Sequence, residues 1–298
     1  MRFPTIGPDA GLLVLAKAPV AGLAKTRLCP PATPVEAARI AAAALLDTLD
    51  AVRAVPGAVD LVAWTGRLAQ AERRTELRIA LAGRPPEPAG SPMRDRLARP
   101  TSDPTNDPAD DPLARDAPVP DALARDAPVR DALARDALAR PRWFAQRGDR
   151  LGDRIAAAHA DAADRLPGRP VLQIGMDTPQ LRPGDLTEAL APLRAPDGPD
   201  AVLGPASDGG WWALGLRDPR AAVLIADVPT SRADTGERTL HVLRAAGLRT
   251  WLLPEHRDVD TADDALAVAS AITNANTPGR FAPAVAELLT RRPVRAGR

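Results

Sequence analysis

The sequence predicts an α/β fold: a three-layer sandwich with a mainly parallel but mixed central sheet, together with a disordered low-complexity insert. Short apolar runs bounded by turn residues alternate with segments of helical period, which is typical of a sheet covered by helices on both faces. Two apolar runs within residues 200–216 are joined by Asp208-Gly209-Gly210, which indicates an antiparallel hairpin in that sheet. Residues 84–140 are rich in Pro, Asp, Ala and Arg, and they interrupt the alternation.

The strands and helices can be placed in order along the chain. Strands are expected where a short apolar run stops at turn-forming residues, at 11–16, 59–64, 171–174, 200–204, 211–216 and 249–253. Helices are expected at 34–55, 67–81, 148–166, 184–193, 235–246, 261–272 and 281–289. Thr33-Pro34 begins the first helix, Thr261 with Asp264 forms a capping box, and Gly247 ends the helix before it.

Composition limits the class of protein. The chain has 298 residues with a formal net charge of +1, which argues against a general binder of nucleic acid or of membrane surfaces. Cys29 is the single cysteine, so no intrachain disulfide is possible. The N-terminus lacks the apolar core of a signal peptide, and no apolar run approaches the ~20 residues that span a bilayer. We therefore expect a cytoplasmic protein of undetermined oligomeric state.

The interruption at 84–140 contains a ten-residue repeat, seen at 111–120 and 121–130 and degraded at 131–140. Each unit has too few large apolar side chains to offset the entropy of ordering. We expect a disordered expansion in a surface loop; the alternative is an insert that binds a partner. The rest of the chain, 1–83 and 141–292, is expected to form one domain.

Residues 171–179 (VLQIGMDTP) combine an apolar run with a turn. The run fits a buried central strand, and Pro179 forces the chain to turn after it. Asp177 is then expected at the carboxyl end of that strand, beside Gly175, where open α/β sheets bind ligands. A carboxylate there can hold a hard cation, or it can simply cap the turn.

The loop after the first strand carries Lys17, Lys25 and Arg27. These cations, with Gly22 allowing close backbone approach, favour phosphate binding over a plain solvated loop. Ala24 stands where the phosphate loop of NTPases needs Gly, and no G-x-G-x-x-G follows the strand. Both of those nucleotide-binding motifs are therefore rejected.

Asp258 and Asp260 flank Val259. In an extended segment, side chains two residues apart point the same way, so both carboxylates would face one cation while Val259 faces the core. With Asp177 they make a plausible magnesium site. The alternative is that the aspartates only begin a helix, where the dipole favours acidic side chains.

The segment 207–212 (SDGGWW) offers Gly209 and Gly210, whose backbone N–H groups can approach a ligand. Adjacent strand residues face opposite sides, so one of Trp211 and Trp212 is expected in the core and the other in a cleft. A tight hairpin with a packed Trp explains the segment equally well. The histidines have no partner at metal-ligand spacing and receive no role.

Four segments in this order, at 15–28, 174–181, 204–216 and 256–264, resemble the bacterial glycosyltransferase-like family of the GT-A, nucleotide-diphospho-sugar transferase superfamily, which has a Rossmann-like fold. The KTRL and DVDT segments are similar also to 2-phospho-L-lactate guanylyltransferase. The chain departs from relatives at Met176 and Thr178, where Ser and Cys are common, and at Trp211-Trp212, where a Tyr pair is frequent. Pro229-Thr230-Ser231 replaces a Pro-Trp-Ser segment, so the acceptor is the least determined part.

The resemblance implies that the first loop cradles a nucleotide and that Asp177, Asp258 and Asp260 bind Mg²⁺ or Mn²⁺. The nucleotide-binding residues predicted from the motifs and the resemblance together are Ala16, Lys17, Gly22, Lys25, Thr26, Arg27, Gly175, Asp208, Gly209 and Gly210. The expected function is a metal-dependent transferase that uses a nucleotide or nucleotide-sugar and a small-molecule acceptor. Nucleotidyl and glycosyl transfer both stay open, no general base is assigned, and the alternative is a non-catalytic nucleotide-binding or scaffold protein.

Overall fold

The computed structural model describes residues 9–81 and 142–290. Its described part contains a seven-stranded sheet in the order β3-β2-β1-β4-β6-β5-β7. The strands are β1 (Ala10–Lys17), β2 (Ala58–Thr65), β3 (Trp143–Ala145), β4 (Val171–Ile174), β5 (Ala201–Pro205), β6 (Trp211–Leu216) and β7 (Thr250–Leu252). The α-helices are α1 (Pro34–Arg53), α2 (Arg74–Leu81), α4 (Leu151–Arg165), α5 (Pro183–Arg194), α6 (Thr235–Ala245), α7 (Ala262–Asn274) and α8 (Phe281–Thr290).

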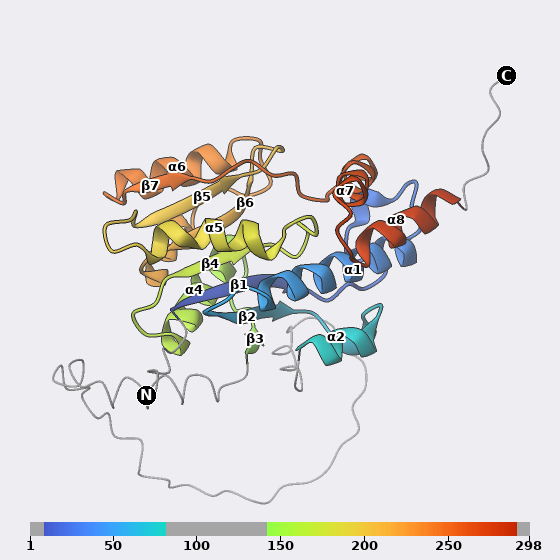
Figure 1. The fold of residues 1–298 in the computed structure, drawn as a ribbon, viewed down its shortest axis with the longest axis horizontal. Coiled ribbons are helices and arrows are strands. Elements are labelled where there is room, and N and C mark those ends of the chain that lie inside the picture. Colours follow the sequence, from blue (N-terminus) through green and yellow to red (C-terminus); the bar gives the residue numbers. More distant parts are fainter. Residues whose placement is uncertain (1–8, 82–141, 291–298) are drawn as a thin grey trace, which may run out of the picture.

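The sheet is mainly parallel, and β6 makes it mixed. β1 pairs in parallel with both β2 and β4, with Val14 opposite Ile174. β6 runs antiparallel to β4 and to β5, so the hairpin expected at 200–216 is confirmed. Because β1, β2 and β4 are parallel neighbours, their carboxyl ends and the loops after them meet at one edge of the sheet (Figure 1).

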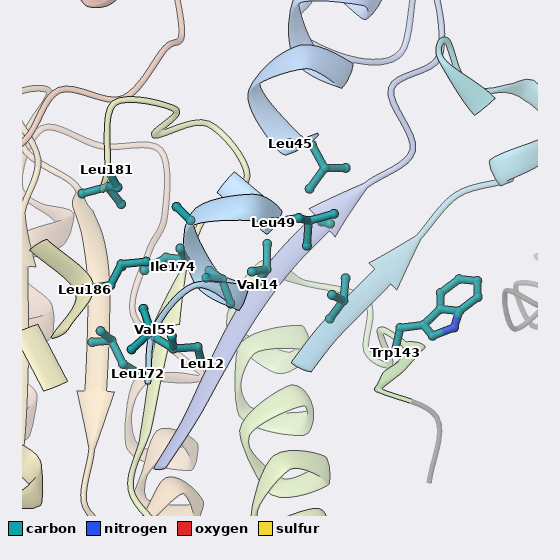
Figure 2. Close-up of a cluster of buried hydrophobic side chains, with 14 of the residues drawn as sticks. Leu12, Val14, Leu45, Leu49, Val55, Trp143, Leu172, Ile174, Leu181 and Leu186 are labelled. Atoms are coloured by element: carbon teal, nitrogen blue, oxygen red, sulfur yellow. The ribbon is translucent and has the colours of Figure 1, made fainter. Parts of the chain in front are cut away.

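Helices cover both faces, which confirms the three-layer expectation. On one face, Leu45 and Leu49 of α1 pack with Val14 of β1, and Leu186 of α5 joins the same cluster (Figure 2). On the other face, α4 packs through Ala158 and Ala162, and α6 through Leu243, together with the 3₁₀ helix Pro219–Ile225. A separate cluster joins α1, α7 and α8 at the end of the molecule where the carboxyl ends of β1 and β4 open (Figure 1).

The helix starts follow the capping signals in the sequence. At α1, the Thr33 backbone N–H donates to Glu36 Oε2 at 2.8 Å, and the Glu36 N–H donates back to Thr33 Oγ1 at 3.3 Å. At α7, Thr261 and Asp264 form the same reciprocal pair. Each cap satisfies backbone N–H groups that the first helical turn leaves unpaired.

The expected helix at 67–81 is wrong in its first half. Residues Leu68–Gln70 form a single 3₁₀ turn, and α2 begins only at Arg74. Between them the chain becomes extended at Ala71, so that the Glu72 N–H donates to the Pro19 carbonyl oxygen at 2.9 Å. Tertiary hydrogen bonding to the first loop thus overrides local helix propensity.

Three elements were not expected, one of which is the 3₁₀ turn Thr26–Leu28 in the loop after β1. The strand β3 is only three residues long, and it is fixed by pairing with β2. An edge-to-face contact between the rings of Trp143 and Trp64, whose centroids are 6.3 Å apart, also holds it in place. The 3₁₀ helix Pro219–Ile225 is capped by Asp218, whose side chain accepts from the Arg220 N–H. Such short elements depend on their neighbours and have little periodicity of their own.

The insert expected at 84–140 lies outside the described residues, and the single-domain expectation for 1–83 and 141–292 stays a prediction. No helix in the described ranges is long and apolar enough to cross a membrane.

Candidate functional site

The site begins at the turn after β4. Asp177 lies there as expected, and its carboxylate folds back over Gly175. A Cβ at position 175 would meet Asp177 Oδ1, so a larger residue here would displace that carboxylate from its position. The turn therefore places a half-buried carboxylate at the carboxyl end of a central strand, where it lines a cavity.

The Asp258-Val259-Asp260 segment packs against the same turn. The Val259 N–H donates to the Asp177 carbonyl oxygen at 2.9 Å, and the Val259 side chain is buried in the cluster formed by α1, α7 and α8. The two aspartates project to the opposite side, and together with Asp177 they offer carboxylate oxygens within 4.8 Å of one another. This is the arrangement that the spacing of the two aspartates predicts; binding of a metal there stays a prediction.

Lys25 lies between two of these carboxylates. Its Nζ is 2.7 Å from Asp177 Oδ2 and 2.9 Å from Asp260 Oδ1, while a guanidinium nitrogen of Arg27 lies 2.9 Å from Asp260 Oδ2. Burial would lower the pKa of Lys25, but Asp177 and Asp260 outweigh it and hold the pKa above its ordinary value. Lys25 therefore stays charged at neutral pH.

Among the residues that the structure describes, no such cation acts on Asp258. Burial, and then the negative charges of Asp177 and Asp208, raise its pKa to about 6. Asp260 shows the opposite balance: burial raises its pKa, but Lys25 and Arg27 lower it below the ordinary value overall. Mutual repulsion among closely spaced carboxylates is what a bound cation relieves, so the chemistry of this donor set fits a hard divalent ion.

A cavity of about 740 Å³ opens beside the carboxylates, a size typical of small-molecule sites. The predicted nucleotide-binding residues that line it are Ala16, Lys17, Lys25, Thr26, Arg27, Gly175, Asp208 and Gly210. Gly22 and Gly209 do not line it; both adopt positive φ and shape the loops that do. The Lys17 Nζ donates to the Leu23 carbonyl oxygen at 2.8 Å. This hydrogen bond lies within the loop after β1 (residues 17–28), which carries Lys17, Lys25 and Arg27 and is called the basic loop.

The hairpin between β5 and β6 forms another wall of the cavity. The Gly210 N–H is 2.7 Å from Asp208 Oδ1, so this N–H serves the turn. A Cβ at Gly209 would collide with the Ala233 carbonyl oxygen, so this glycine is needed where the hairpin meets the loop before α6. Trp212 is buried and Trp211 lines the cavity, so the two adjacent Trp residues face different surroundings, as the sequence indicates.

The structure adds lining residues that the sequence analysis did not single out, among them Gln146, Arg154, Gln173 and Arg232. Gln173 alone had a visible signal, since it is a polar residue inside an apolar strand. Arg154 and Arg232 come from α4 and from the loop before α6, and no local motif marks them. His159 is fully buried and contacts Gln173. The His256 ring packs edge-on against the Trp212 ring, with the two ring centroids 4.8 Å apart.

The chain has a mainly parallel α/β fold with helices on both faces, and its candidate site lies at the carboxyl edge of the sheet. The chain is similar to a crystal structure described as a "putative nucleotide-diphospho-sugar transferase" from Desulfovibrio desulfuricans G20. The TM-score is 0.65 at 20% identity, covering 95% of this chain and 96% of the other. This likeness confirms the fold that the resemblance in the sequence implies; identity at this level shows the fold alone.

At the level of sequence, residues 111–232 match the family model described as "Uncharacterized protein conserved in bacteria (DUF2064)". A second solved structure, CMP:2-keto-3-deoxy-manno-octonic acid synthetase complexed with CTP, overlays with a TM-score of 0.43 at 11% identity. It covers 90% of this chain and 99% of the other, and at this TM-score the overlay carries no argument. No functionally curated protein matches the chain.

Proposed function

We propose that the protein is a metal-dependent transferase that acts on a nucleotide or nucleotide-sugar and transfers a group to a small-molecule acceptor. The observation that carries this proposal is the meeting of three carboxylates with Lys17, Lys25 and Arg27 at one edge of a ligand-sized cavity. Acidic and basic groups at this edge match the two needs of a metal–nucleotide complex. The fold shared with the structure described as a "putative nucleotide-diphospho-sugar transferase" supports the proposal.

The carboxylates would hold the ion. Asp177, Asp258 and Asp260 supply hard oxygen ligands of the kind that Mg²⁺ and Mn²⁺ prefer, and Gly175 leaves the space that the Asp177 carboxylate needs. When bound, the ion neutralises negative charge on the phosphates. Lys25 would then be released from Asp177 and Asp260, and its ammonium becomes available to a phosphate oxygen.

The remaining loop residues would orient the nucleotide. Arg27 offers a forked guanidinium on a side chain that is 67% exposed, so it can turn from Asp260 to a phosphate at little cost. Lys17 is held by the Leu23 carbonyl, with no carboxylate partner among the described residues, so its charge is available to the ligand. In this arrangement the protein supplies positioning and electrostatic stabilisation, which are the main contributions in phosphoryl transfer.

Two reactions satisfy this arrangement. In nucleotidyl transfer, an acceptor oxygen attacks the α-phosphate of a nucleoside triphosphate and pyrophosphate leaves. In glycosyl transfer, an acceptor hydroxyl attacks the sugar carbon of a nucleotide-sugar and the nucleoside diphosphate leaves. The leaving group distinguishes the two directly.

The test is a panel of labelled GTP, CTP and UDP-sugars with mixed phosphorylated and hydroxylated acceptors, each run with Mg²⁺, with Mn²⁺ and with EDTA. Metal-dependent release of pyrophosphate supports nucleotidyl transfer, and release of a nucleoside diphosphate supports glycosyl transfer. If calorimetry finds no nucleotide that binds better with Mg²⁺ than with EDTA, the proposal is wrong.

One observation favours a second candidate, a non-catalytic nucleotide-binding or scaffold protein. The Lys25 ammonium already bridges Asp177 and Asp260, so the protein carries a cation of its own at the carboxylates. A protein of this kind would bind nucleotides equally well in Mg²⁺ and in EDTA and would release no product. The same panel therefore separates the two candidates.

A further inference from the structure

The cavity extends beyond the charged edge, which is formed by the three aspartates and the basic loop, to the face of the sheet covered by α4. There its lining combines Leu15 from β1, Leu151 and Ile155 from α4 and Trp211 from β6 with Arg154, also from α4. The Arg154 guanidinium donates to the carbonyl oxygens of Gly148 and Asp149, at 3.0 Å and 3.2 Å. Gln173 of the central strand β4 adds an amide to this part of the lining. A polar side chain among apolar neighbours fixes the orientation of whatever binds there.

The side chain of Gln173 is oriented by a buried histidine of α4. It is 3% exposed, and its Oε1 lies 3.1 Å from Nε2 of His159, which is 0% exposed on α4. Burial, opposed only by the hydrogen bond to Gln173, lowers the pKa of His159 to about 4, so the imidazole is neutral at physiological pH. A neutral imidazole carries one N–H, and the position of that hydrogen sets the orientation of the glutamine.

The surroundings of His159 select the tautomer. Its Nδ1 is buried without a hydrogen-bond partner in the described ranges. An unpaired N–H is rarer and more costly in a protein interior than an unpaired acceptor, so the hydrogen belongs on Nε2. The Nε2–H then donates to Gln173, which must turn its oxygen toward His159 and its NH₂ group away.

The Gln173 NH₂ group consequently has no protein partner among residues 9–81 and 142–290, yet it is not sealed in the interior. Gln146 in the same cavity is the reverse case, since its Nε2 donates to the carbonyl oxygens of Ala16 and Ala63, both at 2.9 Å. Gln173 therefore presents hydrogen-bond donors to the cavity, whereas the amide group of Gln146 already donates to β1 and β2.

We propose that His159 positions Gln173 as a specificity-determining donor that binds an uncharged oxygen, carbonyl or hydroxyl, on an otherwise apolar or ring-shaped part of the substrate. The inference rests on the proposed function and names the chemistry of the substrate group on the α4 side. The Arg154 guanidinium on this side is already engaged by two backbone carbonyl groups, so the proposal assigns the phosphates to the loop after β1. A carbonyl oxygen of a nucleobase and an oxygen of the acceptor share this chemistry.

The first test needs neither nucleotide nor metal. The side-chain amide signal of Gln173, assigned in ¹⁵N-correlated NMR spectra by its loss in Gln173→Leu, is followed during titration with cyclohexanone, which only accepts hydrogen bonds, and with cyclohexylamine, which only donates when protonated. We expect cyclohexanone alone to shift the signal, and to bind Gln173→Leu about three- to tenfold more weakly, the loss of one buried hydrogen bond. An unshifted amide signal, or equal binding by wild type and Gln173→Leu, would overturn the proposal.

Two further variants separate positioning from packing. Gln173→Glu keeps an oxygen for His159 and presents an acceptor to the cavity, so it should reverse the preference toward cyclohexylamine. His159→Leu frees the amide to rotate, so discrimination between the two probes should shrink. Loss of both probes in every variant, with unchanged circular dichroism, would show only a packing role and would contradict the proposal.

The second test identifies the source of the oxygen. With the GTP, CTP and UDP-sugar panel, a drop in nucleotide affinity of Gln173→Leu would assign the group to the base. Unchanged nucleotide affinity with a raised KM for the acceptor would assign it to the acceptor; no effect on either would overturn the role in substrate binding. Metal-independent nucleotide binding by wild type alongside a positive probe titration would refute the proposed function and leave this inference standing.

Discussion

The ammonium of Lys25 and the carboxylate of Asp177 lie 2.7 Å apart although 152 residues separate them in the sequence. Without a divalent ion, this lysine compensates the negative charge that three aspartates concentrate at the edge of the sheet. A bound Mg²⁺ would take over that role, so metal and lysine compete for the same oxygens. The competition leads to the first two predictions.

Replacing Lys25 with Met should tighten Mg²⁺ binding and weaken nucleotide binding. The Met variant keeps much of the side-chain volume but removes the cation that competes for Asp177 and Asp260. Without metal, repulsion among the carboxylates should lower the melting temperature, and millimolar Mg²⁺ should restore it. Melting curves across a Mg²⁺ series check this; a melting temperature that ignores Mg²⁺ in both proteins would contradict it. Arg39→Met, which removes an exposed ion pair with Glu72, is the matched control.

Asp177→Asn should abolish the Mg²⁺ dependence of nucleotide binding while the fold is kept, because a neutral amide oxygen is a weaker ligand for a hard cation. Asp258→Asn should behave alike. The double variant should cost less than the sum of the two, since both side chains act on one ion. Nucleotide titrations with and without Mg²⁺ measure all three proteins. A full Mg²⁺ response in Asp177→Asn would show that this residue only shapes the turn.

His159 should contribute a loss of stability in mild acid, which Asp258 opposes, because the pKa of Asp258 is raised to about 6 in the folded protein. The pKa of His159 is about 4 in the folded protein and near 6.5 when unfolded, so between these values the unfolded chain binds a proton that the folded one does not. The stability that the neutral His159 contributes is fully present above pH 6.5 and is lost as the pH falls toward 4. At pH 5, the loss relative to neutral pH amounts to about 2 kcal/mol. Urea unfolding at pH 7.5 and pH 5 measures the difference, and it should shrink in His159→Gln. An equal pH dependence in the two proteins would place the titrating group elsewhere.

The repeat segment should be dispensable for folding. Replacing residues 84–140 by a short Gly/Ser linker should leave the melting temperature nearly unchanged, because the repeat has few large apolar side chains and long loops cost little extra closure entropy. A circular dichroism melt of the shortened protein tests this. Loss of soluble protein, or a large fall in the melting temperature, would show that the segment contributes to the core.

Much of the charged edge could be predicted because its signals are local. A buried run ending in Gly175-Met176-Asp177 places one carboxylate, and the two-residue spacing of Asp258 and Asp260 places two more on one side. Their convergence follows from the general rule that ligand sites in open α/β sheets lie at the carboxyl edge.

The α4 side of the cavity could not be predicted in the same way. The contact between His159 and Gln173 exists only because α4 packs beneath β4, and neither residue has a partner at motif spacing. The break in the expected helix at 67–81 has a similar origin, since the Pro19 carbonyl that accepts from Glu72 lies in a distant loop. Single-sequence patterns report local preference, whereas these features report tertiary packing.

The hydrogen bond from Val259 to the backbone of Asp177 has a mechanical consequence. Val259 is anchored in the cluster shared by α1, α7 and α8, whereas Asp177 follows strand β4 of the central sheet, so the spacing of the carboxylates depends on how the C-terminal helices pack. Phe281 of α8 is fully buried in that cluster, far along the chain from the aspartates of the turn. We therefore expect a smaller side chain at Phe281 to change the spacing of the carboxylates, although Phe281 contacts no ligand.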